Sequence, residues 1–115
     1  MSKPVAHYSP SARAGDLLFV SGQLGLLDGA LVDGVEAQTE QALVNLQAVL
    51  ADNGAAIADV AKCTVFMTDI ENFAVVNEVY ASVFGEHRPA RSAIAVKALP
   101  LGGLVEIECF ANLAS

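Results

Sequence analysis

The fold follows from Arg88-Pro-Ala-Arg-Ser-Ala-Ile-Ala-Val-Lys-Ala-Leu-Pro-Leu-Gly-Gly-Leu-Val-Glu-Ile-Glu-Cys-Phe-Ala111. Two runs rich in apolar and β-branched residues, Ser92–Ala98 and Leu104–Ala111, flank a break of sequence Leu-Pro-Leu-Gly-Gly. Pro fixes φ and Gly supplies positive φ, so this break predicts a tight turn. We therefore expect two strands that are joined as a hairpin.

The phase of the two runs gives this expected hairpin two unlike faces. With a period of two, one face carries bulky aliphatic side chains such as Ile94, and the other carries small side chains together with Arg91 and Glu106. A face with several alanines suits close approach by another surface, most simply another subunit, where a guanidinium can grip a carboxylate bidentately. The alternative is a solvated face on which Arg91, Lys97, Glu106 and Glu108 form cross-strand ion pairs.

Three further stretches upstream have the patterns of strands. Asp16–Gln23 alternates as a strand does, and Gly22 within it indicates a bulge or the close approach of another backbone. Leu24–Val32 is typical of a hairpin, because Asp28-Gly29 at its centre is a favoured turn pair. Val60–Met67 is apolar enough to predict a buried strand.

Two stretches have the patterns of helices. The first is expected to begin with Asp33 as its N-cap and Glu36 in the capping-box position, and to run to about Asn53. The second is expected over about Glu71–Phe84, with Thr68-Asp69 before it as a cap. The element order predicts an α+β fold, a two-layer sandwich with a mostly antiparallel sheet and two helices on one face.

Length and composition limit the possible classes of protein. A chain of 115 residues suits one domain spanning 1–115, and its 54% hydrophobic content favours burial beyond a monomer core, hence an oligomer. No apolar run reaches roughly 18 residues, so we expect no membrane span. The first seven residues lack the long apolar core of a signal peptide, which favours a cytoplasmic location.

The formal net charge of −7 argues against nucleic acid as a partner, because such binding relies on Lys and Arg, of which there are six. His7 and His87 lie in loop-like segments without metal-ligand spacing, so we expect surface residues and no metal site. Cys63 and Cys109 lie in apolar strand-like segments, which predicts buried, reduced thiols.

The residues that remain for chemistry are Arg91 and Glu106, which the alternation places on one sheet face. An interfacial Arg can hold the carboxylate of a small substrate and fix its orientation. A partly buried Glu can position or deprotonate a water molecule, particularly if desolvation raises its pKa. Together they suit hydrolysis of a small, reactive acid.

Several blocks, in order over nearly the whole chain, resemble the RidA (YjgF) family. These blocks are Leu17-Leu-Phe-Val-Ser-Gly-Gln23, Lys62-Cys-Thr-Val-Phe-Met-Thr-Asp69, Phe73-Ala-Val-Val-Asn-Glu-Val-Tyr80, Pro89-Ala-Arg-Ser92, Leu99-Pro100 and Val105-Glu-Ile-Glu108. The resemblance implies a chorismate-mutase-like fold and a homotrimer with three sites in clefts between subunits.

The resemblance also implies an activity, the hydrolysis of enamine/imine intermediates such as 2-aminoacrylate to 2-keto acids and ammonia. Arg91 would bind the substrate carboxylate and Glu106 would handle the attacking water. Tyr8 and Ser21 would line the pocket, and Asn77 would contribute from the facing subunit. No metal or organic cofactor is implied, because the imine carbon is already electrophilic.

Two positions depart from the pattern of the family. The best-studied branch has Cys two residues after the motif arginine, where this chain has Ala93. The backbone N–H at Ala93 can still donate to a bound carboxylate, so we expect activity with an altered substrate preference. Tyr8 lies in Ala-His-Tyr-Ser-Pro, where the family more usually has Gly-Pro-Tyr-Ser-Gln.

Two alternatives compete with the trimeric deaminase. One is a non-catalytic trimer that binds small carboxylates or protein clients as a sensor or chaperone-like holdase, in which Glu106 would be replaceable. The other is an endoribonuclease or translation inhibitor, a label that some members of the family carry. The acidic composition and the lack of an acid–base pair placed for phosphodiester cleavage count against this third hypothesis.

Overall fold

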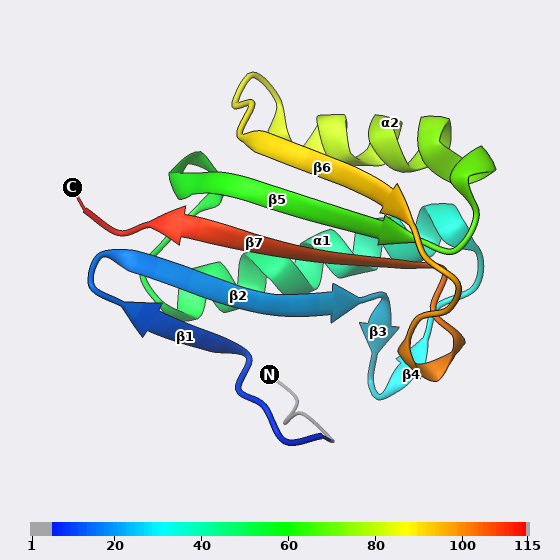
Figure 1. Ribbon diagram of the computed structural model, residues 1–115, viewed down its shortest axis with the longest axis horizontal. Coiled ribbons are helices and arrows are strands. Elements are labelled where there is room, and N and C mark those ends of the chain that lie inside the picture. The colour runs from blue at the N-terminus through cyan, green and yellow to red at the C-terminus, as the bar shows by residue number, and fades with distance from the viewer. Residues whose placement is uncertain (1–5, 115) are drawn as a thin grey trace.

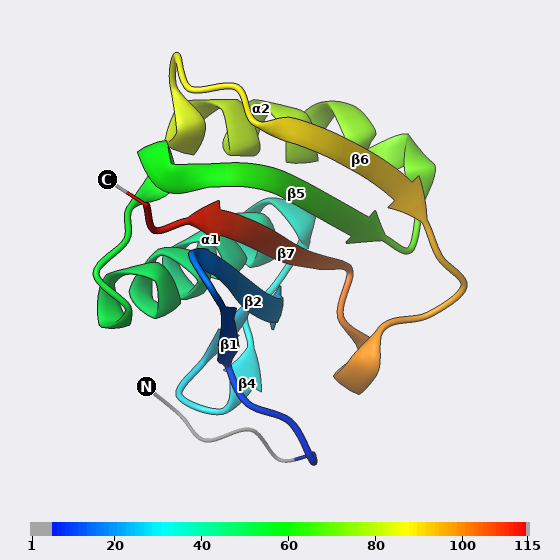
Figure 2. The same ribbon diagram turned by 60° about the vertical axis from the view of Figure 1, so that its left-hand side comes forward.

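The computed structural model describes residues 6–114 and consists of a sheet with helices on one of its faces (Figures 1 and 2). The sheet contains, in spatial order, β1 (Ser11–Ala14), β2 (Leu17–Leu24), β7 (Val105–Asn112), β5 (Val60–Met67) and β6 (Ala90–Ala95). The helices α1 (Val35–Asp52) and α2 (Phe73–Phe84) lie together behind it in Figure 1. Among residues 6–114 the β5–β6 pair is the one parallel pair of this sheet, so the α+β class and the mostly antiparallel sheet are confirmed.

The core lies between the sheet and the two helices. Alternate residues of β7, including Val105 and Ile107, are fully buried, as expected for a strand with one covered face. They pack against the stripe of α1 that contains Leu43, Leu46 and Leu50, each of which contributes about 1.5–3 kcal/mol by burial. Both cysteines are buried free thiols in this layer, as predicted. Within residues 6–114 no helix has the length and hydrophobicity to cross a membrane.

The predicted hairpin within Leu24–Val32 is confirmed. It is formed by β3 (Leu26–Leu27) and β4 (Ala30–Leu31), which pair antiparallel. Asp28 and Gly29 have φ values of 53° and 85°, so both central residues are left-handed. This is the signature of a type I′ turn, whose twist matches that of the flanking strands.

Both helices begin close to the predicted positions, but only one of the two predicted caps forms. The N-cap of α1 is Gly34, whose φ of 90° brings the chain into the helix, and no side chain caps it. The prediction that Asp33 and Glu36 form a capping box is therefore wrong. Asp69 does act as a cap, because its Oδ1 accepts a hydrogen bond from the backbone N–H of Glu71 at 2.9 Å. That bond caps the 3₁₀ turn η2 (Ile70–Asn72), which leads into α2.

The hairpin predicted for the C-terminal stretch is wrong. β6 ends at Ala95 instead of Ala98 and does not pair with β7, because β5 lies between the two strands (Figure 1). The Pro-Gly break forms a 3₁₀ turn, η3 (Pro100–Gly102), outside the sheet. β6 instead runs parallel to β5, with α2 as the crossover that parallel neighbours require. A turn at this break was predicted correctly, but the strand order was determined by the non-local pairing of β6 with β5.

This pairing also reverses the expected faces of β6. Arg91 is the register partner of Cys63 and Ala93 that of Val65, and both partners are buried on the helix side. Arg91 and Ala93 therefore face the helices, whereas Ile94 faces away from them and is 45% exposed. Ile94 and Arg91 thus lie on the faces opposite to those that pairing with β7 would give them.

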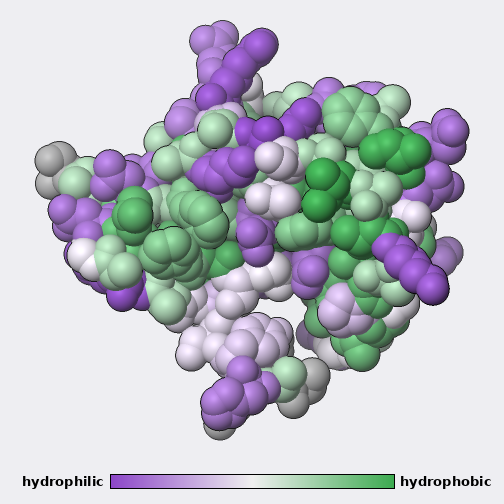
Figure 3. All heavy atoms as spheres, in the orientation of Figure 1, coloured by the Kyte–Doolittle hydropathy of each residue, from purple (hydrophilic) through white to green (hydrophobic). Residues whose placement is uncertain are grey.

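The sheet face away from the helices, which we call the open face, is not covered by any other element of residues 6–114. It carries large apolar side chains, among them Leu17, Phe19 and Ile94, which are 44%, 36% and 45% exposed. Phe19 packs edge-on against Phe110 with ring centroids 5.0 Å apart. Figure 3 looks onto this face and shows two hydrophobic areas with hydrophilic side chains between them. An apolar surface of this kind marks an interaction site more often than a solvated face.

Candidate active site

Arg91 is held by one face of α2. Its Nη1 donates to Oδ1 of Asn77 at 2.8 Å, and its Cζ lies 4.8 Å from the ring centroid of Tyr80 and 5.7 Å from that of Phe73. Phe73, Asn77 and Tyr80 are spaced i, i+4 and i+7, so helical geometry brings them to one stripe. We call Arg91, Asn77, Tyr80 and Phe73 the arginine cluster. A guanidinium held in this way keeps free N–H groups for an anion.

Tyr80 is the buried part of this cluster. Its ring is 7% exposed and stacks on Phe84 with centroids 4.2 Å apart. Its hydroxyl is buried and has no hydrogen-bond partner within residues 6–114. Burial, and after it the neighbouring Cys63 thiol, raise the pKa of Tyr80 far above its ordinary value. The hydroxyl is therefore neutral, and Tyr80 acts on Arg91 through its ring.

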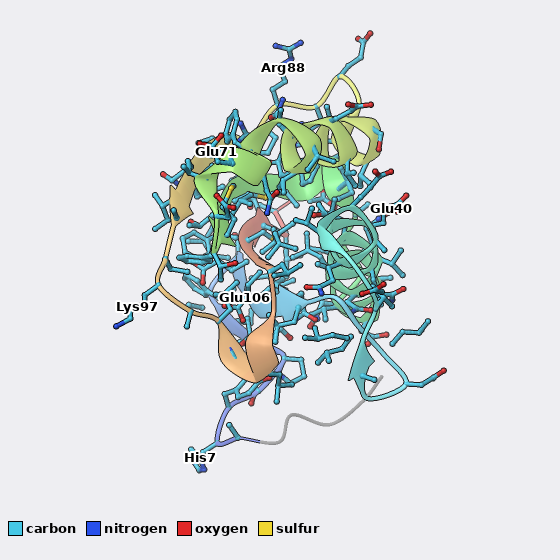
Figure 4. The ribbon with its side chains drawn as sticks, turned by 90° about the vertical axis from the view of Figure 1, so that its right-hand side faces the viewer. His7, Glu40, Glu71, Arg88, Lys97 and Glu106 are labelled. Atoms are coloured by element: carbon cyan, nitrogen blue, oxygen red, sulfur yellow. The ribbon has the colours of Figure 1, made fainter. Side chains whose placement is uncertain are left out.

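A hollow of about 430 Å³ opens beside the arginine cluster. Its lining comes from α2, from the loop after it and from β6, and comprises Asn77, Tyr80, Ala81, Phe84, Gly85, His87, Arg88, Pro89 and Arg91. His87 was predicted to be a surface residue. It is instead tied to β5, because its Nε2 donates to the carbonyl of Val60 at 2.7 Å. Figure 4 shows Arg88 pointing outward from this loop, so Arg91 is the cation fixed within the hollow.

Glu106 lies on the open face of the sheet. Its neighbours Val105 and Ile107 are buried on the helix side, so the alternation of β7 turns Glu106 the other way. Figure 4 shows it at the end of β7 that follows η3. Half-burial raises the pKa of Glu106, and the like charge of Glu108 raises it further. A carboxyl of this kind is a better proton acceptor than an ordinary surface glutamate.

A bulge in β2 lies against Glu106. The register passes from Val20↔Cys109 to Gln23↔Ile107, so two residues, Ser21 and Gly22, oppose one. The predicted bulge at Gly22 is thereby confirmed, and the group that Gly22 borders is the carboxyl group of the Glu106 side chain, not another backbone. We call Glu106, Gly22 and Ser21 the glutamate cluster.

Ser21 connects the glutamate cluster to the N-terminal segment. Its Oγ donates to the carbonyl of Ser9 at 2.6 Å, and its N–H donates to the carbonyl of Pro10 at 2.9 Å. Tyr8 precedes this anchored segment and is 52% exposed. The predicted pocket residues Tyr8 and Ser21 thus belong to the same end of the molecule as Glu106.

The predicted site residues fall into two groups on opposite faces of the sheet. The structure brings Arg91 together with Asn77 of the same chain, so the expectation that Asn77 acts from a facing subunit is wrong with respect to Arg91. Arg91 and Glu106 do not share a face, because β6 takes its phase from β5 and not from β7. The contributions of Tyr80 and Phe73 were missed, although their spacing from Asn77 was visible in the sequence.

A comparison with known families identifies the chain. Residues 1–113 match the family model described as Endoribonuclease L-PSP, which is the YjgF/RidA family. The chain belongs to the RidA family. Over 109 residues it is 45% identical to Reactive Intermediate Deaminase A, chloroplastic, of Arabidopsis thaliana, a match that covers 92% of this chain and 58% of that protein. The chain thus spans somewhat over half the length of this plant member of the RidA family.

Solved structures of RidA relatives have the same fold. RidA from the Antarctic bacterium Psychrobacter sp. is 40% identical, with a TM-score of 0.92 over 95% of this chain and 90% of that one. E. coli TdcF with bound serine is 33% identical, with a TM-score of 0.93 over 97% and 91% of the two chains. At these identities the likeness covers sequence as well as fold.

The two clusters offer a cation and a proton acceptor, and neither of them contains a group of metal ligands. Within residues 6–114, no three or more His, Cys, Asp and Glu side chains gather where they could hold a metal ion. The arginine cluster offers a fixed cation for an anionic group. The glutamate cluster offers a carboxyl whose raised pKa suits proton transfer.

Proposed function

We propose that this RidA-family protein hydrolyses small enamine/imine acids of the 2-aminoacrylate type to 2-keto acids and ammonia. The observation that carries the proposal is the geometry of Arg91, which Asn77 and two aromatic rings hold at the edge of a hollow. A substrate with a carboxylate beside its reactive carbon would be oriented by such a group. The backbone N–H of Ala93 would supply a second donor to that carboxylate.

Two relatives support this choice of substrate. The Arabidopsis relative is named a reactive intermediate deaminase, and the TdcF structure contains bound serine. Serine is an amino acid, and its carboxylate beside an α-carbon resembles that of a 2-imino acid. A pocket for such a ligand needs one fixed cation, which Arg91 provides in this chain.

We propose further that the site is assembled between copies of this chain in a homotrimer. Arg91 and Glu106 lie on opposite faces of the sheet, so they can meet at one substrate only if they come from different copies. The exposed Leu17, Phe19 and Ile94 on the open face supply an apolar surface for such a contact. Tyr8, Ser21 and Glu106 of one chain would then face Arg91, Asn77 and Ala93 of its neighbour.

The reaction needs one proton acceptor. Glu106 takes a proton from water as the water oxygen bonds to the imine carbon, the electrons of the C=N bond move to nitrogen, and Glu106 returns the proton to that nitrogen. Glu106 then takes the hydroxyl proton of the resulting carbinolamine as the C=O bond forms and the C–N bond breaks. This second proton goes to the leaving nitrogen, which departs as ammonia.

The test measures ammonia and keto-acid release from enzymatically generated 2-aminoacrylate and from bulkier imines. Arg91→Ala should lower the rate roughly tenfold or more, because a charge-assisted hydrogen bond contributes about 1.5–3 kcal/mol. Glu106→Ala should lower it while leaving ligand binding intact. If the parent protein does not exceed the rate in buffer, the deaminase proposal is wrong and the carboxylate-binding protein takes its place.

A mixing experiment tests whether the site is shared. Arg91→Ala and Glu106→Ala chains, unfolded and refolded together, should regain activity, because roughly a quarter of sites in randomly mixed oligomers would pair an intact Arg91 with an intact Glu106. Sites built from a single chain would regain none. Assay of a labelled RNA on the same samples separates the endoribonuclease hypothesis, which predicts cleavage that depends on neither residue.

A further inference from the structure

Gly22 has no conformational reason to be glycine. Its φ does not lie in the left-handed region, unlike that of Gly29 or Gly34, so the backbone at this position suits any residue. A β-bulge whose residues are not left-handed is also compatible with residues other than glycine. The reason for glycine at position 22 therefore lies in the space around it.

The space at position 22 is filled by Glu106. A Cβ on Gly22 would lie 2.7 Å from Cδ, 2.8 Å from Oε2 and 3.0 Å from Cγ of Glu106. These distances are far below ordinary van der Waals contact, so the glutamate would have to move. The carboxyl group of Glu106 thus occupies the volume that a side chain at position 22 would take.

Gly25, just beyond the end of β2, gives a useful contrast. A Cβ there would lie 2.6 Å from both Cα and the carbonyl oxygen of Gln38 in α1. A helix backbone cannot move aside as a glutamate side chain can. Gly25 is therefore a packing glycine, whereas the close neighbour of Gly22 is a single movable and chemically active group.

We propose that Gly22 is a positioning residue for Glu106, which the missing side chain and the β-bulge together keep half-buried in its reactive position. The proposal rests on the proposed function, in which Glu106 handles the attacking water. No hydrogen bond within residues 6–114 fixes the Glu106 carboxyl group, so the shape of the bulge is what selects its rotamer. A residue larger than glycine would turn the carboxyl group toward solvent.

The experiment is a set of three variants assayed for imine hydrolysis: Gly22→Ala, Glu106→Asp and the double variant. Gly22→Ala should lower kcat by roughly tenfold to a hundredfold with little change in KM, because a misplacement of about 1 Å is costly for catalysis while Arg91 is untouched. Asp is one methylene shorter than Glu, which withdraws the carboxyl carbon and oxygen that the added Cβ would meet at 2.7 and 2.8 Å. In the Glu106→Asp background, Gly22→Ala should therefore cause no further loss, and equal losses in both backgrounds would overturn the proposal.

A second readout does not depend on activity. Side-chain carboxyl carbons of Glu are followed by NMR during a pH titration, with Glu106→Gln used to assign the signal. Burial and Glu108 raise the pKa of Glu106 in the parent, and a carboxyl turned into solvent in Gly22→Ala should titrate closer to an ordinary glutamate. An unchanged titration would overturn the role of Gly22. If the parent shows no imine hydrolysis, the proposed function fails while this titration still decides about Gly22.

Folding of the variants is also decisive. Gly25→Ala is the matched control, and its loss of thermal stability should not be relieved by Glu106→Asp, because its clash is with α1. If Gly22→Ala fails to fold, Glu106→Asp should restore folding when the clash with Glu106 is the cause. Failure of the double variant to fold would show that Gly22 serves the backbone or another neighbour, and would overturn the proposal.

Discussion

Arg91 and Glu106 are fixed in two different ways. Arg91 is surrounded by contacts, a hydrogen bond to Asn77 on one side and the rings of Tyr80 and Phe73 on others. Glu106 instead occupies the space that a side chain at position 22 would fill. Removal of an atom from a contacting side chain should loosen Arg91, whereas addition of an atom at position 22 should displace Glu106. The two clusters should therefore respond to opposite kinds of substitution.

The largest effect is expected when a negative charge is placed in the arginine cluster. Asn77→Asp keeps the shape of the side chain but puts a carboxylate about where Oδ1 now lies, 2.8 Å from Nη1 of Arg91. The new carboxylate would compete with the substrate for the guanidinium, so KM should rise by roughly tenfold or more. Initial rates over a range of imine concentrations measure this effect.

Asn77→Ala serves as the partner variant. It removes one hydrogen bond, worth about 0.5–1.5 kcal/mol, and adds no charge, so KM should rise less than in Asn77→Asp. Equal effects of the two variants would mean that Asn77 matters only for the packing of α2. In that case the description of Arg91 as held by its contacts would need revision.

The second prediction concerns the pH dependence of stability. Because the pKa of Glu106 is raised in the folded state, folding favours the protonated carboxyl, and stability falls as pH rises from the ordinary value of 4.5 through the raised value. Glu106→Gln removes this loss. Its free energy of unfolding in urea should exceed that of the parent at pH 7 and approach it at pH 4. A constant difference between the two pH values would contradict the burial of this carboxyl.

The smallest effect is expected at Tyr80. Tyr80→Phe removes a buried hydroxyl that has no partner, so the free energy of unfolding should stay within about 1 kcal/mol of the parent or rise. The ring that faces Arg91 remains, and kcat/KM should be unchanged. Tyr80→Leu is the comparison, since it loses the ring, and its KM should rise. A loss of activity in Tyr80→Phe would show that the hydroxyl, and not the ring, serves the site.

Most of the fold could be predicted from local patterns. The alternation in Leu104–Ala111 correctly placed Val105 and Ile107 in the core, and Val60–Met67 was read with its observed bounds. These segments have strong periodicity and one clearly buried face, so their phase is set by the hydrophobic effect alone. The turn at Asp28-Gly29 was predictable because its left-handed backbone restricts the choice of residues.

The face of β6 could not be predicted in the same way. Ser92–Ala98 has alanines on one side and aliphatic residues on the other, which permits either side to face the helices. The choice is made by the parallel register with β5 and by the aromatic stripe of α2, and both are non-local. The sequence therefore identified Arg91 and Glu106 as candidates but did not show that they lie on opposite faces of the sheet.

The bulge at Gly22 also limits how this sequence can change over time. Every substitution of glycine adds at least a Cβ, so each single mutation at position 22 meets the same obstruction while Glu106 is present. A shorter residue at position 106 would remove the obstruction, but at the expense of the proton acceptor. Under the positioning role proposed for Gly22, positions 22 and 106 are epistatic: Glu106 can turn aside to admit a Cβ, so only a lineage that needs the glutamate in its present place has to keep the glycine.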